Sequence, residues 1–155
     1  MKNLKFLGYK VTEMTFRVNP DAEGVRDFKI NPKIRMDLKH NVKNLLLIVT
    51  VAIDKHQDSI TPFELSFSMA SNFEITNQTD IESLRIEASN FVFPYVRASV
   101  AQFTTCANMP AYHLPEIDFS IAKPGTAVYG GSPTPAPQNN ATNSTIVIRP
   151  LDNLD

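Results

Sequence analysis

The sequence predicts an α+β fold, in which a four-stranded antiparallel sheet packs against one long, kinked helix. Four segments alternate apolar and polar residues with a period of two, the pattern of strands that bury one face. The connections between the later segments are short, which favours an antiparallel meander. After residue 79 the apolar spacing changes to three and four residues, which indicates a helix.

The first strand is expected over residues 4–18, where the apolar residues of one parity are Leu4, Phe6, Met14, Phe16 and Val18. This parity predicts one buried face. Leu7, Tyr9 and Val11 make the second face partly apolar, so another element is expected to cover it. After a polar connection at 19–27, residues 33–39, 45–54 and 63–69 supply the other three strands.

The helix is expected to begin at a capping box formed by Thr79 and Glu82. Pro94 lacks a backbone N–H, so we expect the helix to kink or restart near residues 90–93. Apolar residues continue at helical spacing beyond the proline, and the helix should end near Asn108, before Pro110.

The composition divides the chain into two parts. Residues 1–123 have the apolar content of one folded domain, whereas residues 124–155 are rich in Pro, Gly and Asn and predict a flexible or extended tail. Ile146, Val147 and Ile148 form a short apolar, strand-capable segment near the end of this tail.

Charge and hydropathy exclude several classes of protein. The net charge of -1 gives no basic excess that would favour nucleic-acid binding. No apolar run approaches the ~20 residues that span a bilayer, so membrane insertion is not expected. The N-terminal residues lack the continuous apolar core of a signal peptide, and a single cysteine suits a reducing compartment. We therefore expect a cytoplasmic protein.

No set of residues has the spacing of a catalytic or metal site. Cys106 and His113 are seven residues apart and could be read as nucleophile and base, but packing of Cys106 near a helix end is the favoured interpretation. The three histidines have no ligand spacing, and Glu116 and Asp118 are expected to be solvated or to stabilise a turn. We expect neither an enzyme nor a bound cofactor or metal.

Two motifs resemble the SecB family of bacterial export chaperones. Residues 93–97, Phe-Pro-Tyr-Val-Arg, match its F-P-Y-[AV]-R run. Residues 114–119 match its L-P-x-[IV]-[DN]-F stretch, which Pro110 precedes. The resemblance covers roughly residues 4–121 and implies a homotetramer, built as a dimer of dimers. The resemblance implies roles in the fold and in subunit contacts for the residues of the two motifs. These residues are Phe93, Pro94, Tyr95, Arg97, Leu114, Pro115 and Phe119.

The resemblance also implies a function. Members of the family hold unfolded polypeptides or preproteins in apolar surface grooves without ATP, and some deliver them to SecA for export. The alternative is a dedicated chaperone for one partner, such as an antitoxin. Two departures bear on these roles. Pro124 and Gly125 leave room for at most one turn of the family's second helix. The solvent-facing side of the second strand is basic on balance, with Lys33, Arg35 and Lys39 around Asp37, and this charge argues against SecA docking.

The candidate groove residues are apolar positions of the predicted strands and of the connection before the second strand: Phe28, Ile30, Leu45, Leu47, Phe63, Leu65 and Phe67. Each of them also suits an ordinary core position, and the sequence leaves the two interpretations open. The apolar tail segment at 146–148 suggests a further hypothesis, namely that it occupies a groove as a competitor of the client or in place of the missing helix.

Overall fold

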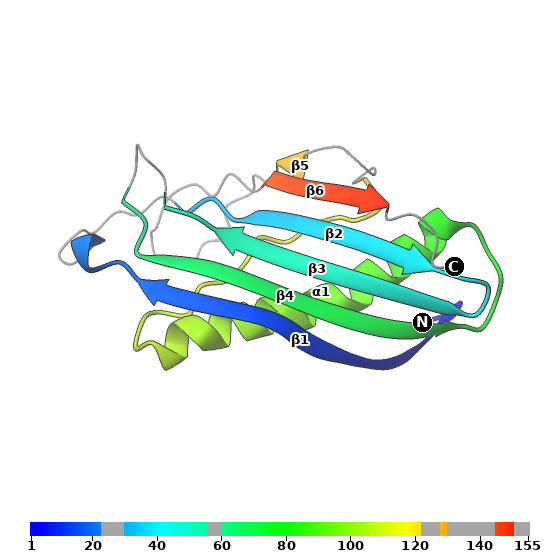
Figure 1. The fold of residues 1–155 in the computed structure, drawn as a ribbon. Coiled ribbons are helices and arrows are strands. Elements are labelled where there is room, and N and C mark those ends of the chain that lie inside the picture. The colour runs from blue at the N-terminus through cyan, green and yellow to red at the C-terminus, as the bar shows by residue number, and fades with distance from the viewer. Residues whose placement is uncertain (23–29, 56–59, 122–127, 130–144, 151–155) are drawn as a thin grey trace.

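The fold has two layers, a sheet and one long helix that lies along one of its faces (Figure 1). The computed structural model describes residues 1–22, 30–55, 60–121, 128–129 and 145–150. The strands are β1 (Leu4–Val18), β2 (Lys33–His40), β3 (Asn44–Ile53), β4 (Phe63–Ile75), β5 (Val128–Tyr129) and β6 (Thr145–Pro150), and the helices are the short η1 (Pro20–Ala22) and α1 (Ile81–Cys106).

The sheet has the strand order β1-β4-β3-β2-β6-β5. The first four strands in this order pair antiparallel, which confirms the predicted four-stranded sheet with one long helix. β6 adds to the edge of β2 in parallel, and β5 pairs with β6 over two residues. The predicted strand-capable segment of the tail therefore lies in the sheet.

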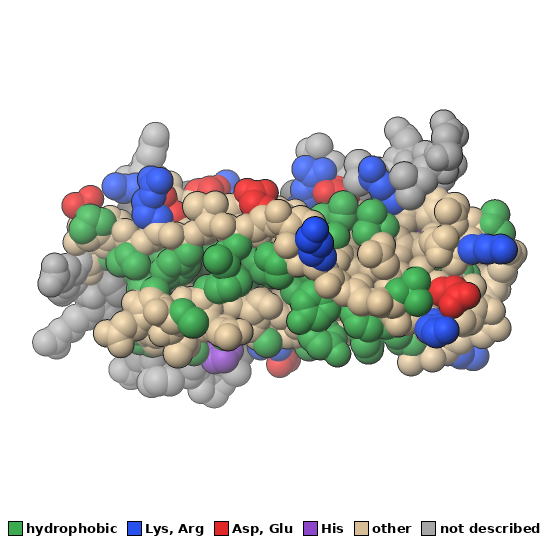
Figure 2. All heavy atoms as spheres, turned by 60° about the horizontal axis from the view of Figure 1, so that its bottom comes forward, with side chains coloured by type: hydrophobic (Ala, Val, Ile, Leu, Met, Phe, Trp, Pro, Cys, Tyr) green, Lys and Arg blue, Asp and Glu red, His purple; other side chains and the backbone are tan. Residues whose placement is uncertain are grey.

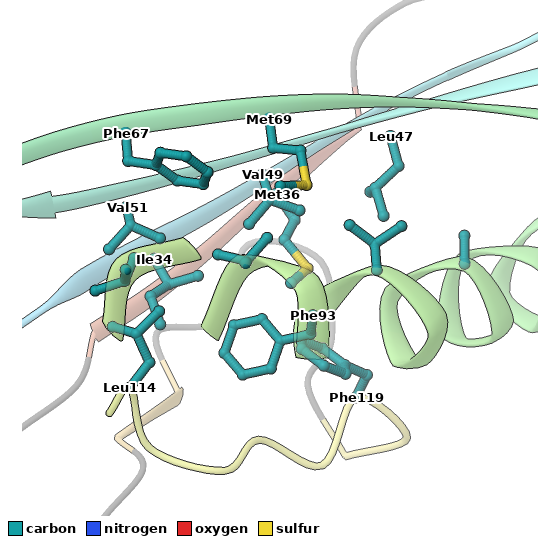
Figure 3. Packing of buried hydrophobic residues seen from close by; sticks show 14 of the residues in the cluster. Ile34, Met36, Leu47, Val49, Val51, Phe67, Met69, Phe93, Leu114 and Phe119 are labelled. Carbon is teal, nitrogen blue, oxygen red and sulfur yellow. The ribbon is translucent and has the colours of Figure 1, made fainter. Parts of the chain in front are cut away.

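The core lies between α1 and the sheet face that alternating residues of β2, β3 and β4 form. On α1 every fourth residue is buried, at Leu84, Ala88, Val92, Val96 and Val100, which makes a single stripe along the helix. Figure 3 shows sheet residues such as Met36, Val49 and Met69 pointing toward α1. Burial of one such large apolar side chain stabilises the fold by about 1.5–3 kcal/mol.

β1 departs from the prediction of one buried face defined by a single parity. Register shifts between Phe6 and Gly8 and between Val11 and Glu13 insert one extra residue at each place. Each such bulge switches the parity of the strand. Gly8 has a φ of 138°, a value that favours glycine, which explains why a glycine stands at the first bulge.

The start of α1 differs from the prediction, and its middle decides between the two predicted effects of Pro94. Asp80, rather than Thr79, caps the helix, because its carboxylate accepts the backbone N–H of Ser83 at 2.9 Å. The helix then runs through Pro94 as one element, so it does not restart there. None of the described helices is long and apolar enough to cross a membrane.

The end of α1 agrees with the prediction of a stop near Asn108. The last helical residue is Cys106, and the N–H of Ala107 still bonds back to the carbonyl of Phe103 at 3.1 Å. Asn108 follows with a φ of 58°, the left-handed conformation that commonly ends a helix. The chain then turns back along α1 toward Phe119.

Candidate functional site

Apolar residues of β1 gather on one face of the strand, the face that looks toward α1. Their register partners on β4, which include Met69, Phe67 and Phe63, are buried on the helix side of the sheet. Because register partners share a face, the two bulges bring residues of both parities to this side. We call them the β1 stripe: Tyr9, Val11, Met14, Phe16 and Val18.

The β1 stripe is poorly covered. Its members Tyr9, Val11, Met14 and Val18 are between 38% and 50% exposed, whereas their partners on β4 are buried. Figure 2 looks onto the side of the molecule where β1 and α1 lie, and a band of hydrophobic side chains runs along it. A continuous apolar band on a small protein marks a surface that binds other molecules.

Aromatic rings form one end of this band. The rings of Phe6 and Phe91 lie 4.9 Å apart, and the rings of Tyr9 and Tyr95 lie 5.6 Å apart, measured between centroids. Phe6 also stacks on Tyr95 at 6.3 Å, so that β1 and α1 are joined by a four-ring cluster. Since Tyr9 and Tyr95 are exposed, this aromatic cluster offers a broad apolar platform to a partner.

A carboxylate on α1 holds the beginning of β1 beside this cluster. Glu87 accepts hydrogen bonds from the backbone N–H groups of Lys2, Asn3 and Leu4, and from the side-chain amide of Asn3. Partial burial alone would raise the pKa of Glu87, but these backbone donors outweigh it and hold the pKa below its ordinary value. The edge strand is therefore fixed to the helix by a charged group.

The two family motifs contact each other at two places. The ring of Phe93 meets that of Phe119 edge to face at 5.2 Å (Figure 3), and Leu114 is fully buried in the same core. Arg97 Nη1 lies 3.5 Å from a carboxylate oxygen of the exposed Glu116. Within residues 93–97, Pro94 and Tyr95 are exposed and accessible to a partner.

Sequence reasoning missed a buried arginine that joins these segments. The guanidinium of Arg85 is nearly inaccessible, donates to the carboxylate of Glu82 and donates to the backbone carbonyl of Phe119 at 3.0 Å. Hydrogen bonding from Arg85 lowers the pKa of Glu82 below its ordinary value. The spacing of Glu82 and Arg85 in the sequence is the signal that could have indicated this pair.

The structure places the predicted groove residues differently from the β1 stripe. Five of them are buried in the core beneath α1: Leu45, Leu47, Phe63, Leu65 and Phe67. Ile30 is partly buried against the same core, and Phe28 lies outside the described residues. Their burial agrees with the core interpretation, which the sequence left open beside the groove interpretation.

A pocket of about 470 Å³ lies where β2 ends and α1 begins. Its apolar lining comes from Val42, Ile75, Ile81 and Leu84, and His40 is among the polar residues that line it. Val42 and Ile81 are exposed, so this pocket is a second place where apolar side chains face solvent.

The residues considered for catalysis are not brought together. Cys106 is exposed at the end of α1 and His113 is exposed on the returning segment, and no hydrogen bond joins them. Asp118 accepts hydrogen bonds from Ser120 in a turn, as expected, and these bonds lower its pKa. Within the part of the chain that the structure describes, no three acidic, His or Cys side chains are placed to hold a metal ion.

Comparisons with known proteins give the same family as the motifs. Residues 4–122 match the SecB family, described as preprotein translocase subunit SecB. The protein-export protein SecB of Blochmanniella pennsylvanica is 30% identical over 112 residues, which are 66% of this chain and 71% of the relative. An uncharacterized protein of Methanocaldococcus jannaschii is 29% identical over 123 residues, which are 74% of this chain and 79% of the relative.

A solved structure shares the fold. It is the SecB-like chaperone Rv1957 of Mycobacterium tuberculosis, in complex with a ChAD peptide from the antitoxin HigA1. The TM-score is 0.61 at 12% sequence identity, and the match covers 75% of this chain and 92% of that one. The SecB family is a family of chaperones, which bind polypeptides and are not enzymes. The match over residues 4–122 and the 30% identity to a SecB relative show that the chain belongs to the SecB family.

Proposed function

We propose that this protein is a cytoplasmic, ATP-independent holdase that binds unfolded or non-native polypeptides on exposed apolar surface. The observation that carries the proposal is the β1 stripe, of which every member except Phe16 is 38–50% exposed beside a well-packed core. An ordinary edge strand would expose polar side chains on such a face. An unfolded client exposes apolar side chains that this surface can bury at roughly 25 cal/mol per Å².

The chemistry of the stripe suits clients of varied sequence. Met14 is flexible and polarizable, and Phe16 and Tyr9 offer ring faces that accept many apolar groups. Apolar contacts are non-directional, so they do not require one client sequence. The half of the stripe from Val11 to Val18 is the part that we assign to clients.

The aromatic cluster at the other end is assigned to contacts between subunits. Tyr95 belongs to the family motif, is exposed, and stacks with residues of β1 at the free edge of the sheet. A terminal strand offers unpaired backbone groups that a second copy of the chain can pair. We infer a homotetramer, built as a dimer of dimers, in which several weak client sites add their affinities.

A second candidate function is that of a dedicated chaperone for one partner. The SecB-like chaperone of Mycobacterium tuberculosis was solved with a peptide from an antitoxin, which supports an antitoxin as the partner class. The range of clients separates the two functions, because a holdase binds many unrelated unfolded chains and a dedicated chaperone binds one. Preproteins for export are one client class of the main proposal.

The proposed function does not include delivery of clients to SecA. Lys33 is exposed on the outer face of β2, and Arg35 is paired with Asp37 at 2.8 Å. The outer side of β2 therefore gives no support for the acidic surface that the family resemblance associates with SecA docking.

The test is suppression of aggregation. An unrelated protein is denatured, diluted into buffer without nucleotide, and followed by light scattering with and without this chain. A holdase should suppress scattering at about one oligomer per client. If scattering is unchanged with three unrelated clients, the general holdase is wrong and the dedicated-partner function replaces it.

A further inference from the structure

We propose that β6 is a tethered stand-in for a client strand: it occupies the edge of β2, and an extended client segment displaces it. This inference rests on the proposed chaperone function and names one of its binding places together with a built-in competitor. The binding place is the edge of β2. In the four-stranded sheet, β2 and β1, which carries the β1 stripe, lie at opposite edges.

The pairing of β6 covers most of β2. Lys33 pairs with Thr145, and the parallel register continues without a shift to Leu38 and Pro150 (Figure 1). β6 thus supplies backbone partners along six of the eight residues of β2. A segment added to a sheet edge in this way binds mainly through its backbone, which is how many proteins recognise extended peptides.

β6 lies outside the part of the chain that matches the family. The family match ends at residue 122, before β5 and β6 begin. Without β6, β2 would end the sheet on this side, next to β3. The other terminal strand, β1, is bulged at two places, whereas β2 pairs with β3 in an unbroken register and offers a regular edge to a new strand.

The sequence of β6 suits this edge and limits its length. Three consecutive apolar residues, Ile146 to Ile148, include two β-branched isoleucines and a valine, which favour strands. Arg149 is the register partner of Asp37. Pro150 ends β6, because proline has no N–H to continue a ladder.

The pairing is of a kind that a client can displace. Parallel ladders are slightly less stable per residue than antiparallel ones, so an antiparallel client strand would gain by replacing β6. A tethered segment competes at a high effective concentration. If β6 is docked about ten times more often than it is undocked, the apparent Kd of a client for this edge is about tenfold weaker than for the free edge.

A reversible lock on β6 tests the inference in the full chain. Lys33 and Thr145 are register partners, and neighbouring strands lie ~4.8 Å apart, a spacing that a disulfide can bridge. The triple variant Lys33→Cys, Thr145→Cys, Cys106→Ala should form this disulfide when oxidised. The ion pair that Lys33 makes with Asp54 is exposed, so its loss should change stability little.

The readout is binding of a labelled, unfolded polypeptide. We expect the oxidised variant to bind it at least threefold more weakly than the same variant after reduction, while the single variant Cys106→Ala is insensitive to redox state. Equal affinity before and after reduction would overturn the inference and leave the holdase proposal intact. If neither form binds any unfolded polypeptide, the proposed function fails together with the inference.

A second variant loosens β6 instead of locking it. Replacing both Ile146 and Val147 with proline removes two consecutive backbone N–H groups from β6, one of which points toward β2. The control variant places the same pair of prolines at Asn139 and Asn140. Amide hydrogen exchange in β2 should rise in the β6 variant and not in the control, and client affinity should increase up to about tenfold. Unchanged exchange in β2 would show that β6 does not occupy the edge.

Discussion

The guanidinium of Arg85, near the beginning of α1, donates a hydrogen bond to the backbone carbonyl of Phe119 across 34 residues of sequence, at 3.0 Å. Phe119 in turn packs edge to face on Phe93, which belongs to the same helix. The returning segment is therefore fastened to α1 at both the backbone and the side chain. These two contacts fix the end of the segment, where a turn at residues 119–121 follows.

Replacing Arg85 with methionine should destabilise the fold. The variant keeps the volume of the side chain but leaves the carbonyl of Phe119 without this donor in a buried place. A buried acceptor left unpaired costs about 1–3 kcal/mol, so we expect a loss of roughly that size in the free energy of unfolding by urea.

The matched control for this variant is Arg97→Met on the same helix. Arg97 pairs with the exposed Glu116 at 3.5 Å, and exposed pairs contribute little. We expect its free energy of unfolding to change by under about 1 kcal/mol. If the two variants lose the same stability, the fastening role of Arg85 is wrong.

Glu87 should make the stability of the edge strand dependent on pH. Its pKa is lower in the folded chain, so its contribution is present above the unfolded pKa and disappears as the pH falls through the folded value. Since the group is largely solvated, we expect about 1 kcal/mol near pH 7 from its hydrogen bonds to the backbone.

The measurement is thermal unfolding of Glu87→Gln and of the unchanged chain between about pH 7 and pH 3. The variant should be less stable at pH 7, and the difference should shrink below the ordinary glutamate pKa of about 4.3. Glu13→Gln is the control, because Glu13 lies on β1 and is exposed. A difference that stays constant down to pH 3 would contradict the role of the carboxylate.

The client half of the β1 stripe predicts a specific loss of binding. In the triple variant Val11→Thr, Met14→Gln, Val18→Thr, three half-exposed apolar side chains become polar while the strand propensity is kept at two of them. Affinity for an unfolded polypeptide should fall about tenfold, which corresponds to about 1.4 kcal/mol. The melting temperature should change little, because these side chains face solvent.

The control for the triple variant lies on the opposite face of the same strand. Lys10→Gln and Arg17→Gln change exposed residues of β1 outside the stripe, and they should leave the affinity unchanged. A similar loss in both variants would indicate that charge or strand stability, rather than the stripe, controls binding.

The aromatic cluster predicts an effect on assembly. Tyr95→Asp places a charge between Phe6 and Tyr9, and burial of an unpaired charge in a subunit contact is unfavourable. In light scattering after size exclusion, the unchanged chain should give about 69 kDa, four times 17.3 kDa, and the variant should give a smaller mass. The control Asn90→Asp, on the exposed side of α1, should leave the mass unchanged. If the mass falls in this control as well, the proposed role of Tyr95 in the subunit contact is wrong.

The sheet and helix could be predicted because their periodicity is strong. The alternation of Ile34, Met36 and Leu38 and the four-residue spacing from Leu84 to Val100 each survive in the structure. The face of β1 could not be predicted from parity, because two single-residue bulges exchange the faces without changing the composition. Gly8 was a signal for the first bulge, but the second, beside Thr12, has no such mark.

The candidate site was harder to predict than the fold. Alternation identifies residues such as Phe67 and Leu47 as apolar, but it does not say whether a helix covers them, and α1 covers both. The role of Arg85 depends on Phe119, which is distant in sequence and adjacent in space. The pairing of β6 with β2 is likewise a long-range contact, for which the sequence offered only an apolar segment of strand-forming residues.

The most direct test of the account is the affinity of this chain for one polypeptide in its unfolded and folded forms. A labelled polypeptide kept unfolded by a destabilising substitution is titrated with the chain, without nucleotide, and its fluorescence anisotropy is followed. We predict a Kd of about 1 μM or lower, equivalent to about -8 kcal/mol, for the unfolded form and no binding of the folded form. Equal binding of both forms, or binding of neither, would contradict the claim that this protein holds unfolded chains on its exposed apolar surface.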